Sequence, residues 1–153
     1  MEPSSERIFW EDLTEGMPLP CRAVSFDRHG IVAFAREFDP QPFHIDEAAA
    51  RASIFGGLIA SSLHTLAACT RSVVDSQGRL AILTGVGMDA VEMFNPVRPG
   101  DVLSIDAHWA DLRRSQSRPE RGYATLKCKV SNQRGDPVVK YGYRYLVACR
   151  RTG

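Results

Sequence analysis

The residues between Arg51 and Arg71 constrain the fold most, because none of them is Asp, Glu, Lys or Arg. Within this stretch, apolar residues recur from Leu58 to about Val74, and Ala, Ser, Thr and Cys fill most of the remaining positions. A helix so uniformly small and apolar has to be covered on most of its sides. We therefore expect a buried helix over residues 58–74, roughly 25 Å long, which follows a flexible loop at Gly56-Gly57.

The same stretch is too polar for a membrane span, which needs about 20 predominantly apolar residues. It contains Gly, Ser, Thr and His residues instead. The polar segment from Met1 to Arg7 also lacks the apolar core of a secretory signal. We expect a cytoplasmic protein with no membrane association.

The second half of the chain is rich in Val, Ile, Leu, Thr and Tyr, which is typical of strands. Turn sequences that contain Pro, Gly, Asn and Asp divide it into four expected strands, over residues 80–93, 102–112, 122–132 and 137–148. A fifth strand is expected over residues 17–26. Runs of strands that follow one buried helix predict an antiparallel sheet curled around that helix, an α+β arrangement. No repeat or linker divides the chain, so we expect one domain over residues 1–153.

Two shorter helices are expected before the central one. Asp27 is a suitable N-cap for a helix over residues 29–38, and Asp46 can cap a second helix that ends at Ala52. Between them, the two prolines of Asp39-Pro40-Gln41-Pro42-Phe43-His44 should prevent a regular helix.

Composition excludes several classes of function. Nineteen basic and eighteen acidic residues give a formal charge of +1, which does not indicate a nucleic-acid partner, so an anionic small ligand would need a local basic patch. The four cysteines are scattered without a C-x-x-C pair, which disfavours a zinc site or a redox motif. We expect four reduced thiols in or near the core.

Four short segments, in this order along the chain, resemble the MaoC-like dehydratases and (R)-specific enoyl-CoA hydratases. They are Trp10–Gly16, the Asp39–His44 segment, Phe55–Ser62 and Phe94–Asp101. The resemblance implies a hot-dog fold, in which an antiparallel sheet wraps around one long central helix. It also implies the reversible addition of water to a 2-enoyl-CoA, giving a 3-hydroxyacyl-CoA, without a cofactor other than the CoA of the substrate. Such proteins form dimers or dimers of dimers, so a homo-oligomer is expected.

The resemblance assigns Asp39 and His44 as the catalytic pair that activates water. Proton transfer to and from a reacting group needs such a carboxylate and imidazole near neutral pH. The alternative interpretation is structural: Asp39 caps a turn before Pro40, and His44 is a buried histidine with satisfied hydrogen bonds. Asp39, His44 and Asp46 have suitable chemistry for a metal, but no third-ligand spacing supports a metal site.

Substrate binding is expected at the start of the central helix, where the first N–H groups lack partners within the helix. The resemblance places the thioester carbonyl at the backbone N–H of Ser62. Small residues here would equally allow close packing of the helix on the sheet. The expected substrate-binding residues are Gln41, Gly57, Ser61, Ser62 and Thr70.

The chain departs from the family pattern at three of these positions. Gln41 stands where the motif usually has Asn, and Ser61-Ser62 stands where the enoyl-CoA hydratases commonly have His-Gly. Related dehydratase-like sequences often have Ser-Gly there, so Ser62 is the more unusual of the two serines. Candidates for the CoA phosphates are five arginines, although a solvated surface explains them equally well. They are Arg98, Arg113, Arg114, Arg118 and Arg121.

Two other functions are compatible with the same fold. One is a non-catalytic acyl-CoA-binding or partner subunit, suggested by the altered Ser61-Ser62 pair. The other is a hot-dog thioesterase, against which the Asp39–His44 spacing argues.

Overall fold

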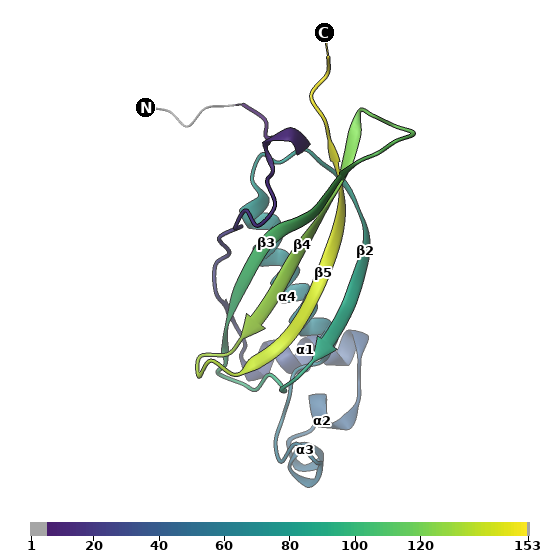
Figure 1. Ribbon diagram of the computed structural model, residues 1–153. Coiled ribbons are helices and arrows are strands. Elements are labelled where there is room, and N and C mark those ends of the chain that lie inside the picture. Colours follow the sequence, from purple (N-terminus) through teal and green to yellow (C-terminus); the bar gives the residue numbers. More distant parts are fainter. Residues whose placement is uncertain (1–5, 153) are drawn as a thin grey trace.

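A computed structural model describes residues 6–152. Residues 1–5, and with them most of the polar start that bears on secretion, lie outside the described part, as does residue 153. Five antiparallel strands form one sheet in the order β1-β3-β4-β5-β2 (Figure 1). The strands are β1 (Val24–Ser25), β2 (Ile82–Met93), β3 (Val102–Arg114), β4 (Arg121–Ser131) and β5 (Pro137–Ala148).

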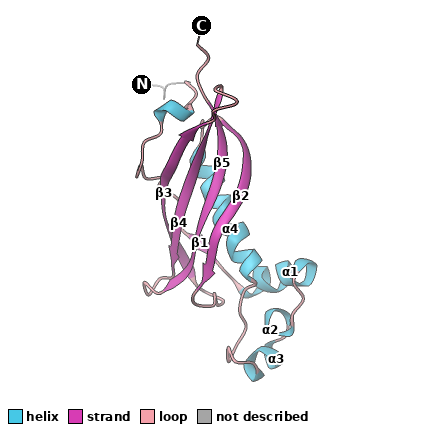
Figure 2. Cartoon of the chain, turned by 45° about the vertical axis from the view of Figure 1, so that its right-hand side comes forward, coloured by secondary structure: helices cyan, strands magenta, loops and turns pink. Residues whose placement is uncertain are grey.

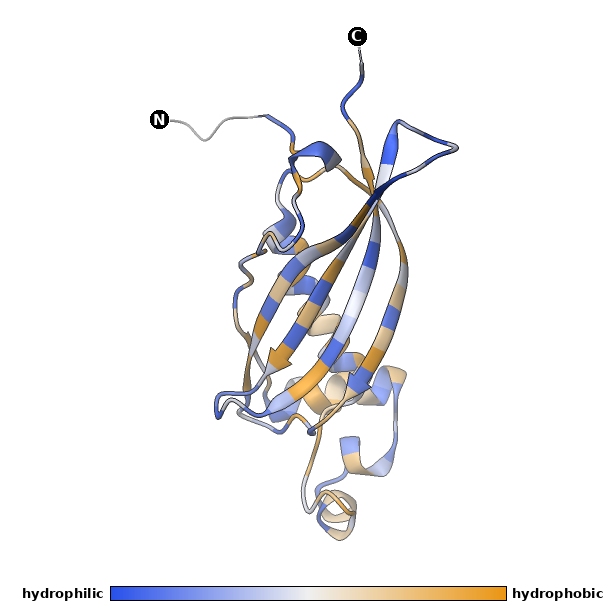
Figure 3. Ribbon diagram, viewed as in Figure 1, coloured by the Kyte–Doolittle hydropathy of each residue, from blue (hydrophilic) through white to orange (hydrophobic). Residues whose placement is uncertain are grey.

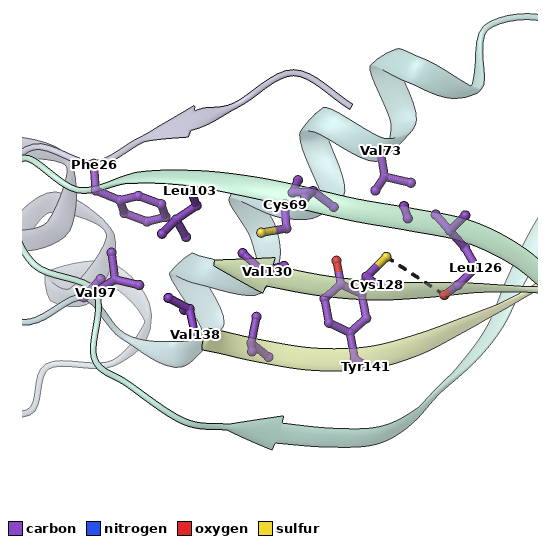
Figure 4. Packing of buried hydrophobic residues seen from close by; sticks show 14 of the residues in the cluster. Phe26, Cys69, Val73, Val97, Leu103, Leu126, Cys128, Val130, Val138 and Tyr141 are labelled. Atoms are coloured by element: carbon purple, nitrogen blue, oxygen red, sulfur yellow. Dashed lines mark hydrogen bonds between the residues drawn. The ribbon is translucent and has the colours of Figure 1, made fainter. Parts of the chain in front are cut away.

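The long helix α4 (Ser62–Gln77) crosses one face of the curled sheet (Figure 2). Cys69 and Val73 of α4 are buried and point towards the sheet, where they lie with Leu126, Val130 and Tyr141 (Figure 4). The expected α+β architecture, an antiparallel sheet around one helix, is thus confirmed. The four cysteines are free thiols, and all except Cys21 are buried.

Alternating side chains explain why the sheet has one dry face. On β4, Leu126, Cys128 and Val130 are buried beneath α4, whereas Lys127 and Lys129 point to solvent. Figure 3 shows the same alternation of hydrophobic and hydrophilic positions along the strands.

The central helix begins four residues later than expected. Residues 58–60 are neither helix nor strand, and their N–H groups bond to other segments. Ile59 N–H donates to Phe43 O at 3.2 Å, and Ala60 N–H donates to Val97 O at 2.8 Å. These bonds hold residues 59 and 60 against Phe43 and Val97, and α4 starts only after Ser61. The Ser61 hydroxyl caps it by accepting the Leu63 N–H at 3.2 Å.

Three short helices lie beyond the end of the sheet: α1 (Arg28–Phe38), α2 (Pro42–Ile45) and α3 (Glu47–Ala52) (Figure 1). The two predicted caps are confirmed, because Asp27 accepts from Gly30 N–H and Asp46 accepts from Ala49 N–H. The expectation that the prolines prevent helix in this segment is wrong for α2. Pro42 occupies the first position of that helix, where its missing N–H needs no partner.

The expected strand over residues 17–26 is also wrong, since only Val24–Ser25 is a strand. The earlier part does follow β3, with Trp109 N–H donating to Met17 O and Leu19 N–H donating to Ala107 O. Pro18 and Pro20 lack an N–H, so this segment cannot form a regular ladder. A 3-10 turn, η1 (Trp10–Asp12), precedes it.

The expectation that the central helix is covered on most sides is wrong for the single chain. Its buried residues are Thr65, Cys69, Ser72 and Val73, of which Cys69 and Val73 pack against the sheet. On the other side, Leu63 and Val74 are 55% and 51% exposed. Within residues 6–152, no helix is long and apolar enough to cross a membrane.

The indole of Trp10 fixes η1 to the sheet. Its Nε1–H donates to Tyr123 O at 3.0 Å, and a Cβ added at Gly122 would lie 2.5 Å from Nε1. We predict that Gly122→Ala displaces Trp10 and lowers the free energy of unfolding by about 1–3 kcal/mol, as measured by urea denaturation. Gly142→Ala is the matched control, because its Cβ would meet only a Thr125 methyl, at 3.2 Å. Equal losses in the two variants would contradict this role of Trp10.

Candidate active site

Asp39 takes its position from the end of α1. Its N–H donates to Ala35 O at 2.8 Å as the C-cap, and Pro40 follows directly. Because a residue before proline is disfavoured in helical conformation, α1 ends here and the carboxylate turns towards α4.

His44 lies on α2 and is only 4% exposed. Its Nδ1 is 2.7 Å from Ile59 O, and a carbonyl oxygen can only accept, so the ring carries a proton on Nδ1. In the neutral ring, Nε2 therefore has a free lone pair. Nε2 lies 3.4 Å from Asp39 Oδ2, which is longer than a good direct N–H···O hydrogen bond. Both atoms can thus contact one water molecule at the open side of the pair.

Both oxygens of Asp39 accept hydrogen bonds from neutral donors. Ser61 Oγ–H donates to Oδ2 at 2.7 Å, and Gln41 Nε2–H donates to Oδ1 at 2.8 Å. The Ser61 bond, then the Gln41 bond, and in smaller part His44, hold the pKa of Asp39 below its ordinary value, against a smaller opposing effect of burial. The stabilisation from ionised Asp39 is therefore complete above about pH 4, the unfolded value. It is lost as the pH falls through the folded pKa.

A cleft of about 370 Å³ opens beside this pair, at the N-terminal end of α4. Asp39, Gln41, His44 and Ser62 line it together with a mainly apolar set of neighbours. The N–H of Ser62 has no hydrogen-bond partner within the described part of the chain. The cleft thus combines a carboxylate, an imidazole and a free amide at a helix N-terminus.

The remaining expected binding residues do not line this cleft. Ser61 is completely buried and faces Asp39. Gly57 lies against the Arg98 guanidinium, 3.3 Å from the position a Cβ would take. The Thr70 hydroxyl donates back to Leu66 O at 2.8 Å and faces Tyr141, Tyr143 and Tyr145 in a separate, narrow space.

Several cleft residues were not anticipated from the sequence. Phe43 and Phe55 form an edge-to-face pair with ring centroids 5.3 Å apart, and the buried Thr65 contributes a hydroxyl. The end of β2 and the next turn supply Met93 to Val97. The Phe94–Asp101 segment belongs to the family resemblance, but nothing in its sequence indicates that its backbone folds against residue 60.

The candidate phosphate ligands are mostly remote from the cleft. The hairpin between β3 and β4, with Arg113, Arg114, Arg118 and Arg121 in or beside it, lies at the end of the sheet opposite to α1, α2 and α3 (Figure 1). At about 3.3 Å per residue, β3 separates the two ends by roughly 40 Å. Arg98 is nearer, but its guanidinium donates to Phe55 O at 2.6 Å and so fixes the loop before α4. Four of the five arginines therefore cannot reach a ligand in the cleft of their own chain.

No cluster of three or more His, Cys, Asp or Glu side chains with metal-binding geometry occurs in residues 6–152. Asp46, the third carboxylate or imidazole considered for a metal, caps α3 instead.

Comparison with known proteins identifies the family. The model of the MaoC-like domain matches residues 13–130. The chain belongs to this family. It is 41% identical to a MaoC-like dehydratase from Rhodospirillum rubrum, with a TM-score of 0.87 over 95% of this chain and 99% of the other. The uncharacterized protein YdeM of Bacillus subtilis is 30% identical over 126 residues, 81% of this chain and 87% of YdeM.

The comparisons also confirm the hot-dog architecture. The R-hydratase PhaJ1 from Pseudomonas aeruginosa aligns with a TM-score of 0.73 over 95% of this MaoC-like chain and 88% of its own, at 22% identity. At that identity the likeness concerns the fold alone.

We predict that His44 has a structural role that can be separated from its chemistry. His44→Ala leaves Ile59 O without its donor in a buried place, which should lower the free energy of unfolding by about 1–3 kcal/mol. His44→Asn can keep a donor near the Nδ1 position while it removes Nε2, so denaturant unfolding should show a smaller loss. If the two variants were equally unstable, the His44–Ile59 bond would not have this role.

Proposed function

We propose that this MaoC-like protein is an acyl-thioester hydratase or dehydratase, which adds water reversibly to a 2-enoyl-CoA to give a 3-hydroxyacyl-CoA. The observation that carries the proposal is the placing of the Asp39 carboxylate beside the free Nε2 of His44, in a cleft that also exposes the Ser62 N–H. When the carbonyl oxygen of an α,β-unsaturated thioester accepts a hydrogen bond from the Ser62 N–H, the C3 atom of the substrate would lie near Asp39 and His44. The apolar lining suits the acyl chain.

In the hydration direction, water bound between Asp39 Oδ2 and His44 Nε2 attacks C3. Its proton passes to Nε2, and the electrons of the C2=C3 bond move towards the carbonyl oxygen, giving an enolate. The proton on Nε2 then passes to C2, the carbonyl is restored, and His44 is neutral again. Asp39 remains ionised and stabilises the imidazolium that forms between the two steps.

The enolate oxygen needs a donor that is already in place. The Ser62 N–H is the first amide of a 16-residue helix, where unpaired N–H groups and the helix dipole both favour negative charge. This role uses the backbone, so it tolerates serine where the family commonly has glycine.

A thioesterase and a non-catalytic subunit remain the competing functions. A thioesterase would release a free thiol from a saturated acyl-CoA, which a hydratase leaves intact. A non-catalytic subunit has no use for an ionised carboxylate and a free imidazole nitrogen in one cleft, so the Asp39–His44 geometry favours an enzyme.

We predict that Asp39→Asn lowers the rate of 2-enoyl-CoA hydration by about 10²–10⁴-fold, because an amide cannot stabilise the imidazolium. The measurement is the loss of ultraviolet absorbance of the conjugated thioester, with a thiol reagent present in parallel. Asp46→Asn is the matched control: it changes an aspartate close in sequence, and asparagine is an equally good helix cap. Hydration by Asp39→Asn at the native rate, or thiol release by the native protein, would reject the proposed reaction.

We further propose that the protein works as a homo-oligomer through β2. This 12-residue strand is an edge of the sheet, and it carries exposed apolar side chains along its length. They are Leu83, Val86, Met88, Val91 and Met93. An exposed apolar edge of this length is a pairing surface.

We predict that Val86→Glu shifts the native oligomer to the mass of a single chain in sedimentation equilibrium, because it places a charge in the edge contact. Ile54→Glu, on the exposed loop before α4, adds the same charge without touching β2 and should leave the mass unchanged. A native protein of single-chain mass at micromolar concentration would contradict the proposed assembly.

A further inference from the structure

Gln41 and Ser61 lie on separate segments of the chain, and both were expected to bind substrate. In the structure, their polar groups point to Asp39. Gln41 donates to Oδ1 of the residue two positions before it, and Ser61, the N-cap of α4, donates to Oδ2. Two side-chain donors from separate segments therefore meet at one carboxylate.

The Ser61 hydroxyl has both of its hydrogen-bonding functions in use. Its single hydrogen goes to Asp39 Oδ2, while its oxygen accepts the Leu63 N–H. Ser61 is completely buried, so solvent cannot replace either bond. The position of Asp39 Oδ2 is thus tied directly to the first turn of α4, which carries the free Ser62 N–H.

The two donors also constrain the chemistry of Asp39. Each donor bonds a different oxygen of Asp39, and a hydrogen bond to an ionised carboxylate is stronger than one to a neutral carboxylic acid. Both contacts therefore favour the ionised form of Asp39. Within the described chain, His44 is the one titratable side chain that acts on Asp39.

We propose that Gln41 and Ser61 are positioning residues that keep Asp39 as a fixed anion, so that His44 alone carries the proton in the reaction. The inference rests on the proposed hydratase function and assigns separate roles within its catalytic pair. Asp39 orients the water and stabilises the imidazolium. Ser61 fixes the position of Oδ2 relative to the Ser62 N–H, which binds the substrate carbonyl.

The charge state can be tested without substrate, by carbon-13 NMR titration of the aspartate carboxyls, with the Asp39 signal assigned by its loss in Asp39→Asn. The native Asp39 pKa should lie below 3.8. It should rise in Ser61→Ala and in Gln41→Leu, and rise further in the double variant. Unchanged titration of Asp39 in both single variants would overturn the inference, even if Asp39→Asn were inactive in hydration.

The positioning role is tested by kinetics. Ser61→Ala should lower kcat for enoyl-CoA hydration about tenfold, the scale of one hydrogen bond to a charged group. KM should change less, because Ser61 does not line the cleft. Ser61→Thr, which keeps the hydroxyl, should recover most of the rate. Native kcat in Ser61→Ala would reject the positioning role.

Two further variants separate this effect from loss of structure. Ser76→Ala removes a hydroxyl from the other end of α4, where it bonds Ser72 O, and should change neither the Asp39 titration nor kcat. If Ser61→Ala loses its fold because it also loses the cap of α4, Gln41→Leu still decides the matter. Gln41 is exposed, and its effect on the Asp39 titration does not depend on the cap.

Discussion

The candidate active site of this MaoC-like protein depends on the backbone N–H and C=O of one residue, Ile59. Its carbonyl accepts a hydrogen bond from His44 Nδ1–H, and its N–H donates to Phe43 O. The segment before α4 is therefore fixed to α2, which carries both of these residues. The neighbouring Ala60 N–H donates to Val97 O on the other side. Residues 59 and 60 therefore bond to α2 and to the turn after β2, and the chain then enters α4 at Ser62. This segment determines which nitrogen of His44 is free and where the helix N-terminus opens.

The same segment explains why an apolar core and a polar site lie next to one another along α4. Farther along α4, Cys69 and Val73 pack against the sheet as ordinary core residues. At its N-terminus, the chain instead presents the buried Ser61 and His44, whose polar atoms are satisfied by Asp39 and Ile59. A buried polar group whose hydrogen bonds are all made is held rigidly and does not lower the free energy of unfolding, whereas an unpaired one does. The site is thus held by the bonds that satisfy its buried members.

The sequence predicted the elements well where periodicity and capping act locally. The alternation on β4 and the Asp27 and Asp46 caps were read directly from neighbouring residues. Local patterns failed where distant backbone groups compete. Residues 59 and 60, just before α4, bond to Phe43 and Val97, which lie far from them in the chain, and no local signal marks residues 58–60 as lying outside the helix. The residues around Pro18 follow β3 for the same kind of reason, without forming a ladder.

The candidate pair was predicted from a motif, and the structure places Asp39 and His44 together. The directions of Ser61 and Gln41 could not be predicted, because a serine or glutamine side chain gives no sequence signal of which partner it bonds. A crystal structure of the Asp39→Asn variant with a 2-enoyl-CoA bound tests the account most directly. We expect the thioester oxygen within hydrogen-bond distance of the Ser62 N–H and C3 beside His44 Nε2. A thioester carbonyl bound away from α4, with C3 remote from His44, would contradict it.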